Sequence, residues 1–258
     1  MSTIYEKFQH LRIVSRAEIM NYFSGDVEKT NSAIRWLIKS GKAQPIKTGL
    51  YYLKRPDEWF EKEVTVSPWL VASKAVPNGV IAYHSALRLR GEAYSETSQF
   101  QIAVGLEFPR APKPIAYQGA NYHFSRADLS FGIEEVPVLD FIVRAFSKER
   151  LLLEGLMAPD RFFGMAEFLK SIEGFKWVNL DSLLTMLPHY PLATISMRLG
   201  WLLEKFRDKW YVGDEILEKL RQNKPQDLAF LEARKRKGNV LVRKWNLMVP
   251  ATLAFLDE

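Results

Sequence analysis

The sequence contains no cysteine, which excludes disulfide bonds and thiolate metal sites. It also contains no run of about 18 apolar residues, and Glu6, Lys7 and His10 stand where a secretory signal would have its apolar core. We therefore expect no membrane span, no membrane partner and a cytoplasmic protein. With 258 residues, of which 47% are hydrophobic and 26% are charged, the chain is long enough to bury a sizeable core.

Signatures of catalysis and of cofactor binding are missing as well. There is no Walker loop, no GxSxG and no GxGxxG. The four histidines lie far apart, without the spacing of metal ligands: His10, His84, His123 and His189. We predict a protein that is not an enzyme and that has no catalytic residue, no cofactor and no metal.

Positive charge is concentrated at the N-terminus. Residues 1–55 contain ten Lys or Arg side chains and four acids, whereas the remaining 203 residues contain 26 of each sign. The whole formal excess of +6 therefore belongs to the first 55 residues. A basic surface of this kind neutralises DNA phosphates and gives an affinity that falls steeply with salt.

Residues 30–53 carry the most informative pattern in the chain. Ala33, Ile34, Leu37 and Ile38 recur at helical spacing, and Gly41 stands where a helix end favours a left-handed residue. Residues 42–46 and 50–53 are strand-like and are separated by Lys47-Thr48-Gly49. The pattern predicts an amphipathic helix that leads into a tight hairpin with a basic tip.

The residues before this pattern complete a known type of DNA-binding module. Ser15 is a suitable N-cap for a helix over 16–23, residues 24–26 form a turn, and residues 4–11 are amphipathic. Three helices and a hairpin are typical of a winged helix-turn-helix. We predict such a DNA-binding domain over residues 1–62 and a second domain over residues 63–258.

Side chains of the predicted recognition helix and wing are the candidate DNA contacts. Asn31 can read adenine and Arg35 can read guanine in the major groove. Lys39, Lys42, Lys47 and Thr48 are assigned to phosphates. The full predicted set is Lys29, Thr30, Asn31, Ser32, Arg35, Lys39, Lys42, Lys47 and Thr48.

Strands precede helices in the rest of the chain, which predicts an α+β fold rather than a doubly wound parallel sheet. The Ser67-Pro68 pair starts an expected helix that ends near residue 76. A small mixed or antiparallel sheet is expected from strands at 100–104, 115–117, 121–124 and 133–138. A final strand is expected at 239–249. Further helices are expected at 83–90, 148–157, 160–171, 181–187, 192–206 and 214–222.

Five segments together resemble the AbiEi family of antitoxins from type IV toxin–antitoxin systems. They occur in the family's order and span most of the chain: SAIRWLIKSGKAQPIKTGLYYL, GVIAYHSALRLRG, KERLLLEGLMAPDRFFG, SMRLGWLLE and VRKWNLMVP. The sequence departs from the family at Gln44-Pro45, where apolar or basic residues are more frequent. Since Pro45 has no N–H, it must lie on the edge side of the first wing strand.

The resemblance implies a transcriptional repressor that binds inverted repeats in its own promoter, its operator, through an N-terminal winged helix. It also implies an α+β antitoxin domain and a neighbouring gene for a nucleotidyltransferase-like toxin, which the antitoxin counteracts without forming a stable complex. A repressor of this kind reads two half-sites of double-stranded DNA as a dimer or as two monomers.

Two other hypotheses remain open from the sequence. A basic run at Arg234-Lys235-Arg236-Lys237, with Arg243 and Lys244 nearby, is also found in RNA-associated or protein-interaction modules. The third hypothesis is a nuclease or transferase whose carboxylates come together only in the fold. It predicts three or more acids in one pocket.

Overall fold

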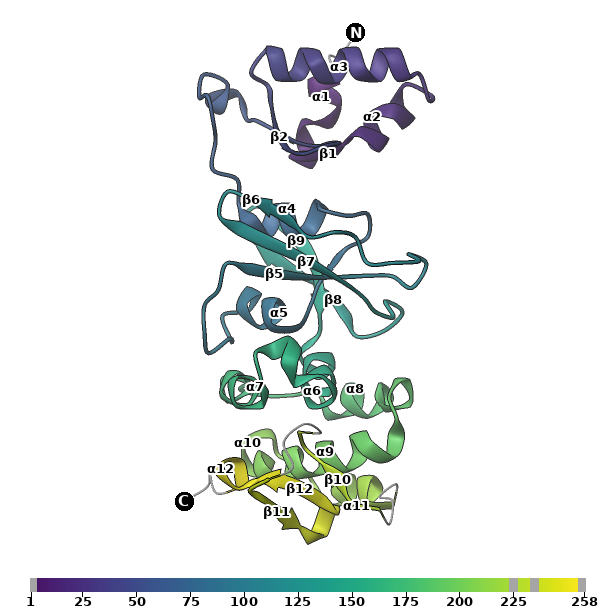
Figure 1. The fold of residues 1–258 in the computed structure, drawn as a ribbon, viewed down its shortest axis with the longest axis vertical. Helices are drawn as coiled ribbons and strands as arrows, with labels where there is room; N and C mark the ends of the chain where they lie inside the picture. The colour runs from purple at the N-terminus through teal and green to yellow at the C-terminus, as the bar shows by residue number, and fades with distance from the viewer. Residues whose placement is uncertain (1–3, 223–226, 233–236, 255–258) are drawn as a thin grey trace. The chain divides into compact units, whose positions relative to one another are not determined.

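The structure is a computed structural model that describes residues 4–222, 227–232 and 237–254 (Figure 1). It confirms the predicted α+β class, with short helices and small sheets. The chain forms two compact units, the first of Met1–Ile81, Ser98–Asp128 and Glu135–Arg144, and the second of Ala82–Thr97, Leu129–Glu134 and Ala145–Glu258. The predicted division into residues 1–62 and 63–258 is a different one and stays a prediction. No helix in the described part of the chain combines the length and the apolar composition that spanning a bilayer requires.

The first unit begins with three helices around a small antiparallel sheet of order β1-β3-β2 (Figure 1). Ser15 and Glu18 form a reciprocal capping box at the start of the second helix, and Asp26 caps the third. The elements are α1 Ile4–Phe8, η1 Gln9–Leu11, β1 Ile13–Ser15, α2 Arg16–Tyr22, α3 Val27–Lys39, β2 Ala43–Lys47, β3 Leu50–Leu53 and η2 Pro56–Glu58.

Helix α3 ends as the sequence predicts. Gly41 has φ +72°, its N–H bonds the carbonyl of Ile38, and the N–H of Lys42 bonds the carbonyl of Leu37. Ile34 and Leu37 are buried, but Ile38 is 41% exposed, so the expected apolar face is wrong for that residue. The buried stripe runs instead through Thr30, one turn before Ile34.

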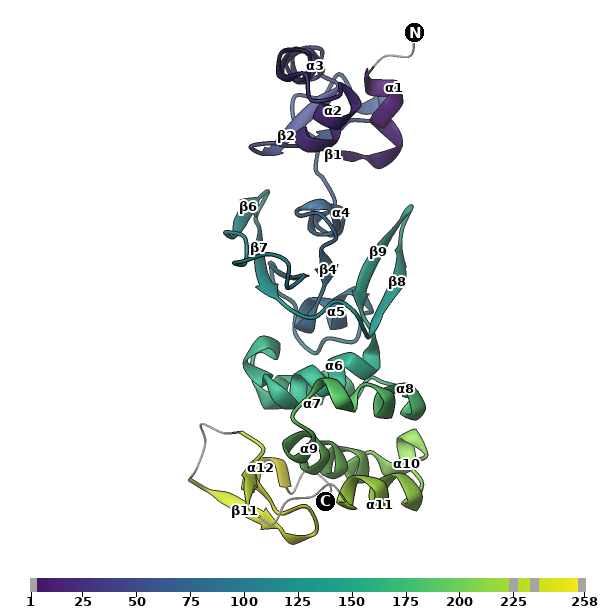
Figure 2. The same cartoon turned by 90° about the vertical axis from the view of Figure 1, so that its right-hand side faces the viewer.

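A six-stranded sheet of order β6-β7-β5-β4-β9-β8 follows. It is mixed, since β5 pairs with β7 in parallel and with β4 antiparallel. Strand β9 was not predicted, and Figure 2 shows it beside β8 as a hairpin. The elements are α4 Pro68–Lys74, β4 Val80–Ile81, β5 Gln99–Val104, β6 Ile115–Tyr117, β7 Ala120–Arg126, β8 Ile133–Val138 and β9 Phe141–Phe146.

Two glutamines hold the segment that leads from β3 to α4. Gln44 accepts a hydrogen bond from the N–H of Val64 (2.8 Å) and donates one to the carbonyl of Val64 (3.0 Å). Gln118 accepts from the N–H of Val66 (3.0 Å) and donates to the same Val64 carbonyl (2.8 Å). Side-chain amides thus provide the hydrogen bonds that a neighbouring strand would provide.

The second unit is mainly helical. Two predicted elements are interrupted because Phe163, Gly164 and Asn246 adopt positive φ, which splits the helix expected at 160–171 and the strand expected at 239–249. Its elements are α5 Tyr83–Leu89, α6 Lys148–Met157, η3 Pro159–Phe162, α7 Met165–Ile172, α8 Leu180–Thr185, η4 Leu187–His189, α9 Leu192–Lys205, α10 Arg207–Trp210, α11 Asp214–Gln222, β10 Ala229–Phe230, β11 Asn239–Val242, η5 Arg243–Trp245, β12 Leu247–Pro250 and α12 Ala251–Ala254.

The core of the second unit is packed closely around two glycines. A Cβ atom on Gly155 would lie 2.1 Å from the ring of Phe168, and one on Gly200 would lie 2.1 Å from the ring of Trp245. Both glycines and both aromatic side chains are buried. Neither position therefore accepts a larger side chain without displacement of an aromatic ring.

Candidate nucleic-acid interface

The exposed face of α3 carries most of the predicted DNA contacts. Lys29, Asn31, Ser32, Arg35 and Lys39 are all exposed there. Asp26, at the start of the helix, pairs with Lys29 at 3.1 Å. A hydrogen bond from the Lys29 backbone N–H, and a second from its side chain, hold the pKa of Asp26 below its usual value. The exposed face of α3 therefore carries cations and polar side chains, and the start of the helix is fixed by the Asp26 cap.

Three elements converge on a surface hollow of about 330 Å³ beside this face. Asn31, Ile34 and Arg35 come from α3, Arg16 from the first turn of α2 and Tyr51 from β3. Arg16 and Tyr51 were not predicted. The available signal for Arg16 was its place on the predicted helix before the recognition helix, since the first helix of a helix-turn-helix motif crosses the DNA backbone.

Hydrogen bonds connect Arg16, Asn31 and Arg35 in the hollow. Arg16 donates from Nη2 to Oδ1 of Asn31 at 3.2 Å. Arg35 donates from Nε to the backbone carbonyl of Asn31 at 3.3 Å. The backbone of Arg16 is held in turn, because its N–H donates to the carbonyl of Gly49 at 2.8 Å. The two arginines and the asparagine are thus arranged together before any ligand binds.

Thr30 is a correction to the predicted set. Its side chain is fully buried, and its hydroxyl donates to the carbonyl of Asp26 at 2.6 Å. The prediction is wrong for this residue because Thr30 lies on the same helical stripe as Ile34 and Leu37. It contributes to the core of the module, and its side chain is not accessible to DNA.

The two lysines of the predicted wing are directed into the protein. The ammonium of Lys42 lies over the rings of Trp59 (4.3 Å), Trp36 (5.0 Å) and Tyr5 (5.4 Å). The ammonium of Lys47 donates to the carbonyl of Ala75 at 3.1 Å, and burial lowers its pKa. Both are half-buried, and the structure does not place them as phosphate contacts. Thr48, at the turn, is exposed as expected.

The C-terminal basic run is described only in part. Arg234, Lys235 and Arg236 lie outside the described residues. Lys237 and Arg243 are exposed, and Lys244 pairs with Glu204.

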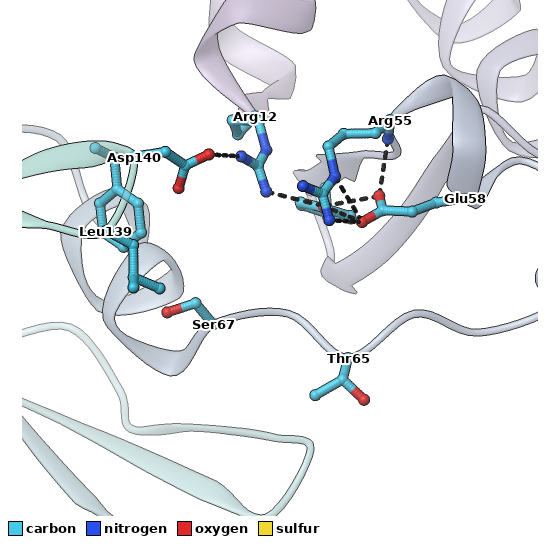
Figure 3. A pocket seen from close by; sticks show the side chains of 9 residues that line it. Arg12, Arg55, Glu58, Thr65, Ser67, Leu139 and Asp140 are labelled. Atoms are coloured by element: carbon cyan, nitrogen blue, oxygen red, sulfur yellow. Dashed lines mark hydrogen bonds and ion pairs between the residues drawn. The ribbon is translucent and has the colours of Figure 1, made fainter.

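A larger hollow, of about 540 Å³, lies elsewhere in the first unit (Figure 3). Arg12 donates to Asp140 (2.6 Å) and to the Tyr52 hydroxyl (3.2 Å), and Tyr52 and Arg55 both bond Glu58. Burial alone would raise the pKa of Glu58, but the hydrogen bonds from Arg55 and Tyr52 outweigh it and lower that pKa. The hollow is lined by Arg12, Tyr52, Arg55, Glu58, Thr65, Ser67, Leu139, Asp140 and Phe141.

This larger hollow does not have the arrangement that the enzyme hypothesis predicts. It contains two acids, Glu58 and Asp140, and each is paired with an arginine. Among the residues that the structure describes, no three His, Asp or Glu side chains lie close enough together to hold a metal ion. His84, which is buried, lies 3.3 Å from Glu167, and burial lowers its pKa.

Comparisons with known proteins found a protein of similar fold and gave no information about function. No family model matches the sequence, and no curated protein is significantly similar to it. The chain is similar to the crystal structure of the RV2827C protein from Mycobacterium tuberculosis, with a TM-score of 0.57 and 14% sequence identity. That similarity covers 96% of this chain and 90% of the other. At 14% sequence identity, this similarity shows a shared fold and does not extend to function.

Proposed function

We propose that this protein is a DNA-binding transcriptional repressor that uses residues 1–62 as a winged helix-turn-helix. The order α1-β1-α2-α3-β2-β3, with β1 paired to β3 in a three-stranded sheet, supports this proposal because winged modules have this arrangement. Helix α3 is then the recognition helix, and the turn at Thr48-Gly49 is the tip of the wing.

The observation that carries the proposal is the convergence of Arg16, Asn31 and Arg35 on one exposed hollow. Arginine and asparagine are the side chains that read guanine and adenine bidentately. Lys29, Ser32 and Lys39 surround them on the same helix and suit phosphate contacts. The excess charge of the first 55 residues provides the sequence-independent part of the affinity.

We further propose that the target is an inverted repeat in the protein's own promoter and that the protein is the antitoxin of a type IV toxin–antitoxin operon. This part of the proposal is supported by the resemblance of five sequence segments to the AbiEi family. It implies a nucleotidyltransferase-like toxin that is counteracted without a stable complex, and a monomer or dimer on the DNA. No described feature favours the RNA-associated, protein-interaction or enzymatic hypotheses over this one.

The test is binding of the purified full-length protein to the duplex upstream of its gene. A shuffled duplex of the same base composition serves as competitor, and the salt concentration is varied. We expect a specific preference of about a thousandfold or more. Arg35→Ala should lower specific binding about tenfold or more, because it removes a base contact.

Arg110→Ala is the matched control, since Arg110 is an exposed arginine far along the chain from α3. It should leave the preference unchanged. If the wild type binds both duplexes equally, or if Arg110→Ala and Arg35→Ala weaken binding to the same extent, the repressor proposal fails.

A further inference from the structure

Asn31 has an amide that can present either its oxygen or its nitrogen to position 6 of a purine, where adenine has a donor and guanine has an acceptor. With Oδ1 as acceptor and Nδ2 as donor, the amide pairs with N6 and N7 of adenine. Guanine has an acceptor, O6, in place of the N6 donor, so Oδ1 would face another lone pair. The orientation of the Asn31 amide therefore decides which purine it accepts.

We infer that Arg16 is a positioning residue that fixes this orientation and so makes Asn31 selective for adenine. This inference rests on the DNA-binding function proposed above. The guanidinium Nη2 donates to Oδ1 of Asn31 at 3.2 Å. If the amide were rotated, its NH₂ group would face the NH₂ of Arg16, and two donors would oppose each other. The amide oxygen has a second lone pair, which stays available for adenine N6.

Arg16 can act in this way because its backbone is held against the turn of the hairpin. Its backbone N–H donates to the carbonyl of Gly49, and the position of a Cβ on Gly49 would lie 3.7 Å from the Cβ of Arg16. The start of α2 is therefore fixed to the turn of the hairpin. Asn31 is fixed on α3, where its carbonyl accepts a hydrogen bond from Arg35 at 3.3 Å. The separation of the two backbones, and so the reach of Arg16 to Asn31, is thus set by the module rather than by the DNA.

The experiment selects preferred duplexes from a random library with the full-length wild type and with Asn31→Ala. The position at which Asn31→Ala loses its preference is the base pair that Asn31 reads. At that position the wild type should favour adenine over guanine about tenfold or more, and it should lose a similar factor when the adenine is replaced by 7-deazaadenine, which lacks N7.

Arg16→Met is then compared with Lys39→Met, which removes an exposed cation that does not contact Asn31. Both variants should bind more weakly and with a smaller salt dependence. Only Arg16→Met should reduce the adenine preference, to about threefold or less. Circular dichroism and thermal unfolding of each variant establish that the module is folded.

The outcomes are separable. If Arg16→Met keeps the wild-type preference at that position while its affinity falls, Arg16 is only a phosphate contact and the inference is wrong, although the repressor function stands. If Lys39→Met loses the preference as well, the effect is one of charge, and the inference is again wrong. If the wild type selects no sequence, the DNA-binding proposal fails and the inference fails with it.

Discussion

The contrast between Lys39 and Lys47 gives a direct test of how the module meets DNA. Both are basic residues of the predicted interface, but Lys39 is exposed on the last turn of α3, whereas the Lys47 ammonium bonds the carbonyl of Ala75 at 3.1 Å. A lysine that is held in this way cannot also neutralise a phosphate. We therefore expect Lys39→Met to weaken DNA binding and Lys47→Met to leave it unchanged.

The size of the effect follows from counterion release. Each phosphate contact contributes about 0.9 to the slope of log affinity against log salt concentration. For Lys39→Met we expect the slope to fall by about 0.9, which amounts to a difference of about three- to fourfold in affinity across a fourfold change in salt. For Lys47→Met we expect no change of slope, but a loss of about 1 kcal/mol in the free energy of unfolding, because a hydrogen bond is removed.

Fluorescence anisotropy of a labelled duplex at salt concentrations of about 50 to 200 mM gives both slopes, since protein–DNA affinities change measurably over this range. Urea denaturation gives the free energies. A decrease of slope for Lys47→Met as large as that for Lys39→Met would refute the reasoning, because it would mean that Lys47 leaves Ala75 and reaches the DNA.

Three further predictions concern stability. Gly200→Ala should lower the thermal midpoint by about 4–8 °C, since overpacking against Trp245 costs about 3 kcal/mol and the better helix propensity of Ala returns about 1 kcal/mol; an unchanged midpoint would contradict the packing. In urea titrations, Glu58→Gln should lower the free energy of unfolding by about 2 kcal/mol, because this buried carboxylate accepts hydrogen bonds from the Tyr52 hydroxyl and from the backbone N–H and Nε of Arg55. Asp140→Asn, at a side chain that is 60% exposed, should cost less than about 1 kcal/mol; equal costs would argue against this difference. Because burial lowers the pKa of His84, the unfolded chain binds its proton more readily, so the free energy of unfolding should fall as the pH drops below about 6.5. His84→Gln should flatten that dependence and His123→Gln, at an exposed side chain, should not; the same profile for both variants would exclude His84 as the cause.

Local signals in the sequence predicted local structure well. Ser15 caps the helix that follows it, and Gly41 ends α3 with the positive φ that its position implied. Residues 24–26, predicted as a turn, also supply the cap of α3 through Asp26, which was not predicted. The predicted range 148–157 is the range of α6. In each case the determining atoms lie within a few residues of one another, so periodicity and capping chemistry contain the information.

Contacts between distant residues account for what was missed. Lys42 is of a residue type that commonly contacts phosphates, but its ammonium lies among the rings of Tyr5, Trp36 and Trp59, which are up to 37 positions away in the sequence. Arg16 enters the candidate site because the hairpin turn at Gly49 holds it. Sequence spacing specifies which face of a helix is polar, whereas the partner of a long, flexible cation depends on the tertiary structure.

The two glutamines that hold residues 64–66 have a consequence for the exchange of amide hydrogens. The N–H groups of Val64 and Val66 belong to no helix or strand, yet they donate to the side chains of Gln44 and Gln118, and both valines are buried. Amide protons exchange with solvent deuterium only when such bonds open. These two positions, in a segment that secondary structure alone would class as a loop, are therefore expected to exchange as slowly as the amides of a paired strand.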